Sequence, residues 1–380
     1  MNDTNWSVPE SEVLNSIRET LDDGGRGVLA TIIDVEGSAY RRPGAKMVSP
    51  EGGDGVGHIT AGCLEDEVHN LASDVLDAGE PRVETYDLRP ESETDVWGLG
   101  VGCNGVLDIL IEPIDEGLRP VVDAVADDRD VGVATVVDAP DPDVVGRRAY
   151  YHPESETFEA AALPDDVAAA VRDAVEDLTE RGKSNTVTVG DVTVFVDGIA
   201  APSDLVLVGS GNDAGPLSEL GKRAGFRVTV VGFRGVTATE ERFPAADRVE
   251  STSPARIREA VDFDEDTYVV VATHNFVDDR IAVDELLSTP VPYVGLMGPR
   301  KRFEEMREDF REEGREFSAD ELDRLYTPVG LDLGGGTPHQ IALSIVGEVL
   351  AVENGREPQH LKDREGTIHE RVELSTDGAN

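Results

Sequence analysis

The chain has 380 residues, of which 78 are acidic and 34 are basic, so its formal net charge is -44. This length is too great for one compact core and predicts two domains, and the excess of acid excludes general binding to nucleic acid. The acidic residues are spread along every segment, which predicts a solvated surface adapted to concentrated salt, as in a halophile. The alternative, an acidic face that docks a basic partner, would concentrate the charge.

Cysteine content and hydropathy indicate in which cellular compartment the protein is expected. The chain has two cysteines, no apolar run long enough to span a membrane, and no charged-then-apolar leader. These features predict a cytoplasmic protein with free thiols in a reducing environment. No internal repeat or low-complexity tract is evident in the sequence.

The first half shows an α+β pattern. Apolar residues at helical spacing predict a helix that begins with Ser11 as its N-cap and ends at Gly24. The other patterns predict helices within 63–79 and 165–178, and strands within 28–34, 82–88, 105–114, 132–139, 185–189 and 192–198.

The pattern changes near residue 200, where apolar strands begin to alternate with amphipathic helices. This alternation predicts βαβ units of a parallel sheet, with strands at 205–208, 228–231, 268–273 and 292–298. The predicted fold class is therefore α/β, with an N-terminal α+β domain over 1–199, a C-terminal Rossmann-like doubly wound parallel sheet over 200–355, and a polar tail over 356–380.

A glycine turn follows the first of these parallel strands. Gly209, Gly211 and Ala214 fit the spacing G-x-G-x-x-A between a strand and a helix, where backbone N–H groups can hold a phosphate. An NAD site would next place an acid at the end of the second strand, but that position is Gly232. Arg234 is placed to meet a phosphate instead. The alternative is a tight turn that serves only helix–strand packing.

Basic residues gather at the same predicted edge of the sheet. His274 stands at the C-terminal end of a parallel strand, where open α/β sheets bind ligands. It is a candidate proton donor or phosphate contact, and a helix-capping or buried structural histidine is the alternative. Arg300 and Arg302 open a later helix near this edge. Together these residues favour an anionic ligand.

The first half has a cationic turn and a cysteine of its own. Arg41, Arg42 and Lys46 surround a Pro-Gly turn, for which the alternative is a simple solvated turn. Cys63 follows Gly62 at the entry to a helix, where the helix dipole and free N–H groups favour a thiolate. A small buried cysteine is the alternative.

The second cysteine lies in the stretch GLGVGCNG. Gly100 and Gly102 precede Cys103, and glycines at this density indicate either a very tight turn or a ligand lying against the backbone. A zinc site usually needs four ligands that lie close together. Here the two cysteines are far apart in the sequence, the histidines are scattered and there is no C-x-x-C motif, so a zinc site is not expected.

These blocks resemble the XdhC/CoxI family, the accessory proteins of xanthine dehydrogenase and related molybdenum hydroxylases. The resemblance covers most of the chain. In the first half it is carried by EGSAYRRPGAKM, GHITAGCLEDEV and VWGLGVGCNGVLDILIEP, and in the second by VLVGSGNDAG, VATHNFVDD, YVGLMGPRKR and PVGLDLGGGTPHQIALSIVGEVLA.

The resemblance implies a chaperone-like maturation factor rather than a turnover enzyme. Such a factor binds molybdenum cofactor (molybdopterin), with or without an appended nucleotide, protects it during sulfuration and helps insert it into an apo-molybdenum hydroxylase. Soft thiolates suit a molybdenum–sulfur centre, which makes Cys63 and Cys103 candidate molybdenum ligands through the cofactor. The expected cofactor-binding residues are Arg42, Lys46, Cys63, Gly100, Gly102, Cys103, Gly209, Gly211, Ala214, Arg234, His274 and Arg300.

Other partners and functions stay open at this point. A cysteine desulfurase and a second copy of the chain are candidate partners. The main alternative function is an NAD(P)-dependent oxidoreductase, with the Rossmann-like domain as its cofactor domain and His274 as its candidate catalytic residue. A nucleotide-sensing regulator is a third interpretation.

Overall fold

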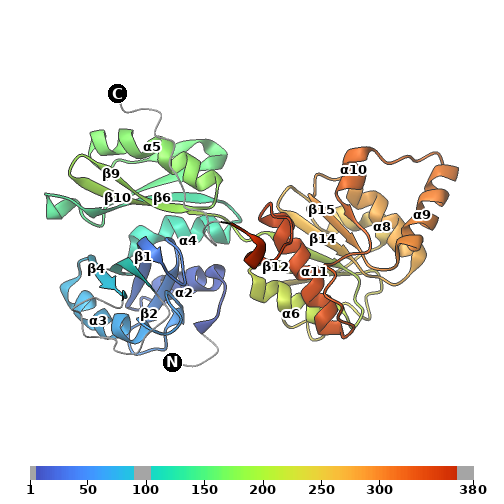
Figure 1. Cartoon of the computed structure of the whole chain (residues 1–380), viewed down its shortest axis with the longest axis horizontal. Coiled ribbons are helices and arrows are strands. Elements are labelled where there is room, and N and C mark those ends of the chain that lie inside the picture. Colours follow the sequence, from blue (N-terminus) through green and yellow to red (C-terminus); the bar gives the residue numbers. More distant parts are fainter. Residues whose placement is uncertain (1–5, 90–103, 366–380) are drawn as a thin grey trace. The chain divides into compact units, whose positions relative to one another are not determined.

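The computed structural model describes residues 6–89 and 104–365, which fall into two compact units. The first unit extends to Ala201 and the second begins at Pro202 (Figure 1). Antiparallel sheets in the first unit and a parallel six-stranded sheet in the second confirm the predicted fold class. Within the described ranges, no helix has the length and apolar character needed to cross a membrane.

The first unit contains two five-stranded antiparallel sheets. The first sheet has the order β3-β2-β1-β5-β4 and is built from β1 (Gly27–Ser38), β2 (Lys46–Pro50), β3 (Val56–Gly57), β4 (Arg82–Asp87) and β5 (Asn104–Pro113). The second sheet has the order β8-β7-β6-β10-β9 and is built from β6 (Val131–Asp138), β7 (Arg148–His152), β8 (Thr157–Glu159), β9 (Ser184–Val189) and β10 (Val192–Ile199).

The two sheets have the same topology, and the helices extend the correspondence. One helix precedes each sheet, and a second helix joins its third strand to its fourth. These helices are α2 (Glu10–Asp22) and α3 (Glu65–Ala78) with the first sheet, and α4 (Arg119–Ala126) and α5 (Asp165–Glu180) with the second. The first unit is therefore one α-β-β-β-α-β-β arrangement built twice, as a first copy (residues 10–113) and a second copy (residues 119–199). The sequence had shown no repeat.

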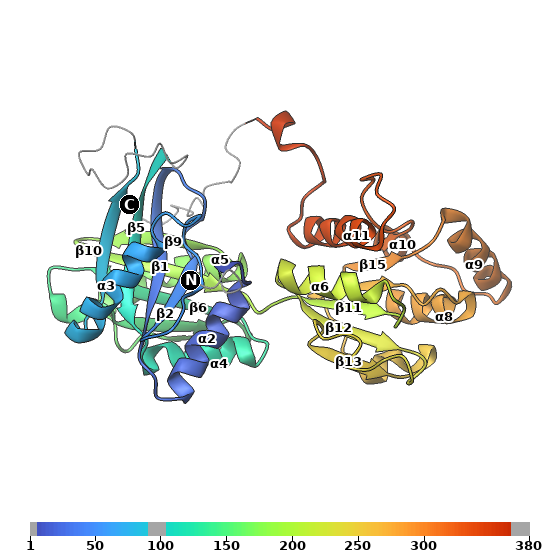
Figure 2. The same ribbon diagram turned by 90° about the horizontal axis from the view of Figure 1, so that it is seen from below.

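Apolar clusters hold these elements in layers. Helix α3 packs on the outer face of the first sheet through Val68 and Val75, and α5 packs on the outer face of the second sheet through Val171 and Val175 (Figures 1 and 2). Helices α2 and α4 contact each other and share a cluster with strands of both sheets. The inner faces of the two sheets meet between these layers.

One predicted helix boundary was wrong. Helix α2 begins at Glu10 with Pro9 as its N-cap, so Ser11 lies inside the first turn. Proline fixes φ near the value needed at a helix entry, and Glu10 and Glu12 favour the positive end of the helix dipole. Gly24 takes a left-handed φ of 64° just beyond the C-cap, as its glycine identity predicts.

The second unit is a doubly wound parallel sheet with the strand order β13-β12-β11-β14-β15-β16. In chain order this is 3-2-1-4-5-6, the arrangement typical of a Rossmann fold, and its switch point lies between β11 and β14. The strands are β11 (Asp204–Val208), β12 (Arg227–Gly232), β13 (Arg248–Ser251), β14 (Thr267–Val271), β15 (Tyr293–Leu296) and β16 (Leu325–Tyr326).

Helices cover both faces of this sheet. One face packs against α6 (Ala214–Ala224) and α11 (Pro338–Glu353), which lie side by side (Figure 1). The other face packs against α7 (Ile257–Ala260), α8 (Phe276–Leu287) and α9 (Arg300–Glu312), and the short α10 (Ala319–Asp323) precedes β16.

Candidate functional site

Three connections of the first copy leave the same edge of the first sheet. Residues 39–45 join β1 to β2, residues 58–64 follow β3, and residues 88–103 join β4 to β5. Antiparallel pairing brings the ends of β1, β3 and β4 to one edge. The predicted contacts Gly100, Gly102 and Cys103 lie outside the described residues. The two other connections carry Arg41, Arg42 and Cys63.

A buried carboxylate holds the loop that carries Cys63. The Glu65 side chain, only 2% exposed, accepts hydrogen bonds from Thr60 N at 2.7 Å, Ile59 N at 3.2 Å and Leu64 N at 3.2 Å. Thr60 Oγ1 donates to Glu65 at 2.5 Å and accepts from Cys63 N at 2.9 Å. Backbone and side-chain bonds together therefore fix Cys63 just before α3, where the sequence predicted it.

The Cys63 side chain is half-buried and packs at the margin of the cluster between α3 and the first sheet. The same cluster includes Ala39, from the connection after β1, and Leu88, from the residues that follow β4. Cys63 and residues of both neighbouring connections thus pack against the same cluster. Its thiolate character stays a prediction.

A histidine orients the first arginine of the cationic turn. Arg41 Nη1 lies 3.3 Å from His58 Nε2, and His58 Nδ1 lies 2.9 Å from the carbonyl oxygen of Trp6. A guanidinium only donates, so Nε2 is the acceptor and Nδ1–H donates to Trp6. The imidazole also stacks on the Trp6 indole, with 4.5 Å between ring centroids. Burial, together with the charge of Arg41, lowers the pKa of His58 and favours this neutral tautomer.

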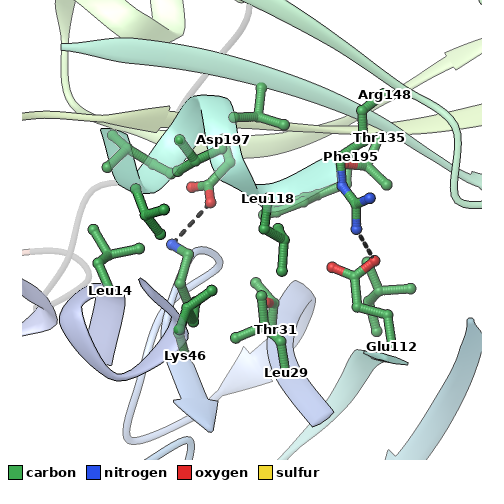
Figure 3. Close-up of a pocket in the computed structure, with 16 residues that line it drawn as sticks. Leu14, Leu29, Thr31, Lys46, Glu112, Leu118, Thr135, Arg148, Phe195 and Asp197 are labelled. Atoms are coloured by element: carbon green, nitrogen blue, oxygen red, sulfur yellow. Dashed lines mark hydrogen bonds and ion pairs between the residues drawn. The ribbon is translucent and has the colours of Figure 1, made fainter. Parts of the chain in front are cut away.

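The third cation of the turn lies elsewhere. Lys46 is 6% exposed and points into a small cavity of about 30 Å³ between the two sheets (Figure 3). Its Nζ lies 2.8 Å from Asp197 Oδ2 and 2.5 Å from Glu10 Oε1. Burial alone would lower the pKa of Lys46, but these two carboxylates raise it above its usual value. Lys46 is therefore buried and paired, rather than presented at the surface with Arg41 and Arg42.

A second ion pair lines the same cavity. Arg148 of β7 pairs with Glu112 of β5, and both side chains are buried (Figure 3). Burial raises the pKa of Glu112, while the adjacent Arg148 opposes that rise. The cavity is thus lined by two ion pairs and otherwise mainly by apolar side chains.

In the second unit, the glycine turn is packed against a neighbouring loop. Gly209 has φ 137°, and a Cβ on it would lie 2.3 Å from the carbonyl oxygen of Ala272. A Cβ on Gly211 would lie 2.5 Å from Asp213 Oδ1. Ala214 is buried at the first position of α6. Close backbone packing therefore accounts directly for Gly209.

His274 lies at the switch point, in the loop after β14. It has φ 59°, a left-handed conformation that side-chain-bearing residues seldom adopt. Its Nε2 lies 2.8 Å from Asp213 Oδ2, so the pair bridges the loops after β11 and β14. The imidazole is 59% exposed, and the N-cap of α8 is Asn275. The structure therefore excludes both the buried and the helix-capping alternatives for His274.

A buried carboxylate supports this strand end. Asp279, 1% exposed, accepts hydrogen bonds from Thr273 N at 3.1 Å, Thr273 Oγ1 at 2.5 Å and Arg302 Nη2 at 2.5 Å. Arg302 thus holds Asp279, which in turn accepts a hydrogen bond from the backbone N–H of Thr273, next to His274. Arg300, the other predicted basic residue of α9, is exposed at its first position.

The position where an NAD site would place an acid is closed by packing. Gly232 ends β12, and a Cβ there would lie 2.5 Å from Ala238 Cβ and 3.1 Å from Ser210 Oγ. Ser210 Oγ lies 2.6 Å from Thr237 Oγ1, which ties the glycine turn to the loop after β12. Arg234 is exposed on that loop, and its Nη2 lies 3.4 Å from a carboxylate oxygen of Asp278.

Sequence reasoning missed the supporting residues of both sites. Thr60 and Glu65 flank Cys63, and Asp213 stands inside the glycine motif, but their roles depend on contacts that only the fold creates. A carboxylate directly before a predicted helix was the available signal for Asp213. His58 was not among the predicted binding residues, and its contact with Arg41 was not foreseen.

Two family models match the chain. Residues 20–87 match the model described as XdhC and CoxI family, and residues 205–349 match the model described as XdhC Rossmann domain. The first match contains Arg41, His58 and Cys63, and the second contains Gly209, Asp213 and His274.

Relatives match over nearly the whole length. A Bacillus subtilis protein named as a probable xanthine dehydrogenase subunit is 30% identical over 87% of this chain and 94% of its own length. The Escherichia coli protein named "Molybdenum cofactor insertion chaperone PaoD" is 20% identical over 92% of this chain and 93% of its own. A crystal structure described as a xanthine dehydrogenase from Bacillus halodurans has a TM-score of 0.73 and 27% identity, covering 92% of this chain and 97% of that one. The chain therefore belongs to the XdhC and CoxI family.

Proposed function

We propose that this protein binds molybdenum cofactor and helps load it into a molybdenum hydroxylase. The observation that carries the proposal is the edge of the first sheet, where a thiol and two arginines lie on adjacent connections of one copy. Relatives named for xanthine dehydrogenase and for cofactor insertion support the same conclusion.

The side chains at this edge suit the chemistry of the cofactor. A half-buried thiol is a soft donor, and molybdenum–sulfur centres accept soft donors. Guanidinium groups form paired hydrogen bonds with phosphate oxygens, which suits the phosphate of a pterin cofactor. When bound, the cofactor supplies the molybdenum centre on which the hydroxylase depends.

The protein's own residues would bind and orient the cofactor. Glu65 and Thr60 fix the backbone on both sides of Cys63, so the sulfur needs little ordering on binding. His58 holds one nitrogen of Arg41 and leaves the guanidinium's other N–H groups for an anion. Cys103 is a second candidate ligand from the sequence alone.

The further steps belong to the same proposal. Protection of the cofactor, its sulfuration and its insertion require an apo-molybdenum hydroxylase and a source of sulfur such as a cysteine desulfurase. A second copy of the chain is a candidate partner. The second unit would then serve recognition or regulation rather than redox chemistry.

Contacts in the second unit disfavour the alternative of an NAD(P)-dependent oxidoreductase. The Asp213 carboxylate stands at the start of α6, where a diphosphate would have to bind, and would repel it. Ala238 and Ser210 occupy the space around Gly232, where a ribose-binding acid would stand. Arg234 already faces Asp278.

The test is the molybdenum content of a Cys63→Ser variant, purified in concentrated potassium chloride from a molybdenum-replete host. Serine keeps the size but not the soft sulfur, so we expect most of the molybdenum and pterin absorption to be lost at an unchanged Tm. Asn70→Ser, an exposed change on α3, should leave both unchanged. Full molybdenum content in folded Cys63→Ser, or stoichiometric nicotinamide in the wild type, would refute the proposal.

A further inference from the structure

The repeated architecture of the first unit provides an internal comparison for every candidate residue of the site. The turn before β2 is built twice with the same hydrogen bonds. Gly44 N donates to Ile32 O at 2.8 Å, and Gly146 N donates to Val136 O at 2.8 Å. Both glycines are left-handed, with φ of 94° and 83°. Residues 41–46 therefore correspond to residues 143–148.

This correspondence distinguishes residues that both copies need for their structure from residues that only the first copy has. Lys46 corresponds to Arg148, and both are buried cations that pair with a carboxylate of the opposite copy. The strand register supports this correspondence, because Lys46 pairs with Thr31 in the first sheet and Arg148 pairs with Thr135 in the second. A cation at this position is thus part of the interface between the two sheets. Lys46 is explained without a ligand.

The two arginines, in contrast, have no basic counterpart in the second copy. Ala45 N donates to Arg42 O at 3.1 Å, and its counterpart Arg147 N donates to Val144 O at 3.2 Å. Arg42 therefore corresponds to Val144, and Arg41 corresponds to Asp143. The second copy builds the same turn with an apolar residue and an acid.

The loop and helix after β3 also correspond. Val56 pairs with Val48 in the first copy, and Glu159 pairs with Tyr150 in the second. Since Val48 corresponds to Tyr150, Val56 corresponds to Glu159. The same number of residues then leads to a left-handed glycine, Gly79 in one copy and Gly182 in the other. The buried helix positions coincide along the way: Val68, Ala72 and Val75 correspond to Val171, Val175 and Leu178.

At this spacing the second copy lacks the chemistry of the first. His58, Thr60, Cys63 and Glu65 correspond to Ala161, Leu163, Asp166 and Ala168. The connection between the last two strands is also shorter, since Gly190 and Asp191 join β9 to β10, whereas residues 88–103 join β4 to β5. The same fold therefore forms without an arginine pair or a histidine at this edge.

We propose that Arg41 and Arg42 form a binding site for a small phosphate-type oxyanion, present once per chain and only in the first copy. His58 is a positioning residue, because its neutral Nε2 accepts from Arg41 and fixes the guanidinium. The second copy builds the same turn without these cations, which favours a role for them in binding an anion rather than in forming the turn. The proposal deepens the proposed function, since it assigns the phosphate end of the cofactor to this turn.

The experiment measures pyrophosphate binding by calorimetry at one fixed potassium chloride concentration. We expect the wild type to bind one pyrophosphate per chain and Arg41→Asp to bind at least about tenfold more weakly. The matched control is Arg147→Asp, which makes the same charge change in the turn of the second copy and should bind within about twofold of wild type. Failure of the wild type to bind, or equal binding by Arg41→Asp, would overturn the proposal.

Two further variants test the internal comparison and the role of His58. Arg41→Asp combined with Arg42→Val installs the residues of the second copy and should fold with an unchanged Tm; its failure to fold would overturn the claim that the fold does not need the arginines. His58→Ala should weaken pyrophosphate binding, and His58→Gln should restore it, because an amide oxygen can accept from Arg41. Equal binding by His58→Ala and wild type would refute the positioning role.

The pyrophosphate measurement needs no molybdenum, so the two proposals fail separately. A wild type that binds pyrophosphate through Arg41 but purifies without molybdenum would leave the anion site standing and contradict the proposed function.

Discussion

His58 shows how one side chain can connect a structural contact to a proposed binding residue. Its Nδ1–H donates to Trp6, its ring stacks on the indole, and its Nε2 faces Arg41. Only the neutral ring satisfies all of these contacts, because a protonated Nε2 would face a cation. The orientation of Arg41 therefore depends on the protonation state of His58.

We expect the contact between His58 and Arg41 to be lost in acid. Burial and Arg41 lower the pKa of His58 below 6.5, so the unfolded chain binds this proton more readily than the folded one. The stabilisation is complete above about pH 6.5 and is lost as the pH falls through the lowered folded-state pKa. An NMR titration should place the His58 midpoint below about 6.5 and show it rising in Arg41→Gln. A midpoint at or above the ordinary value would contradict the assigned tautomer.

At the scale of elements, β-branched runs and glycines allowed most strands and helices to be predicted. The repeat stayed hidden because the two copies share few residues: Thr31 with Thr135, Gly44 with Gly146, and Gly79 with Gly182 are among the positions that agree. These are positions that the backbone constrains, whereas the packed positions accept any apolar residue of suitable size.

The sites could be predicted only in part. Local sequence patterns predicted that Cys63 lies just before a helix and that His274 lies at the end of a strand. The contacts of Arg41 with His58 and of Asp213 with His274 join residues far apart in the chain, so no local pattern contains them. The burial of Lys46 also depended on Asp197, which lies in the other copy.

The glycine turn of the second unit gives a sharp test of packing. Gly209→Ala would force a Cβ to 2.3 Å from Ala272 O at a φ of 137°, so we expect a loss of about 2 kcal/mol or more in the free energy of unfolding. Gly215→Ala, in α6 with open space around it, should leave stability unchanged or raise it by up to about 1 kcal/mol. Urea unfolding at constant salt measures both, and equal stabilities would contradict the packing role.

At the scale of the whole molecule, the charge sets the conditions for folding. Acidic residues number 78 against 34 basic ones, so even if every cation paired with one carboxylate, 44 acidic residues would have no cation. Several of the cations are held in buried or structural pairs, such as Lys46, Arg148 and Arg302. The remaining carboxylates repel one another across the surface.

We therefore expect Tm to rise with potassium chloride. Between roughly 0.1 M and 3 M salt, the Debye length falls from about 10 Å to below about 3 Å, which removes most of the repulsion between exposed carboxylates. Scanning calorimetry measures Tm across this range, and sucrose controls for general exclusion effects, since it does not screen charge. A Tm independent of salt would show that the surplus charge does not destabilise the fold.

The two ion pairs between the sheets make the repeated arrangement self-complementary. Lys46 and Glu112 belong to the first copy, and Arg148 and Asp197 belong to the second, so each copy brings one cation and one carboxylate. Two identical copies related by a twofold axis would satisfy each other in the same way, as in an isologous dimer. A single copy therefore carries both the cation and the carboxylate that a symmetric pair of such copies would need, and such a pair would have two equivalent edges. Within one chain the two edges need not stay equivalent, so the first copy has Arg41, His58 and Cys63 where the second has Asp143, Ala161 and Asp166.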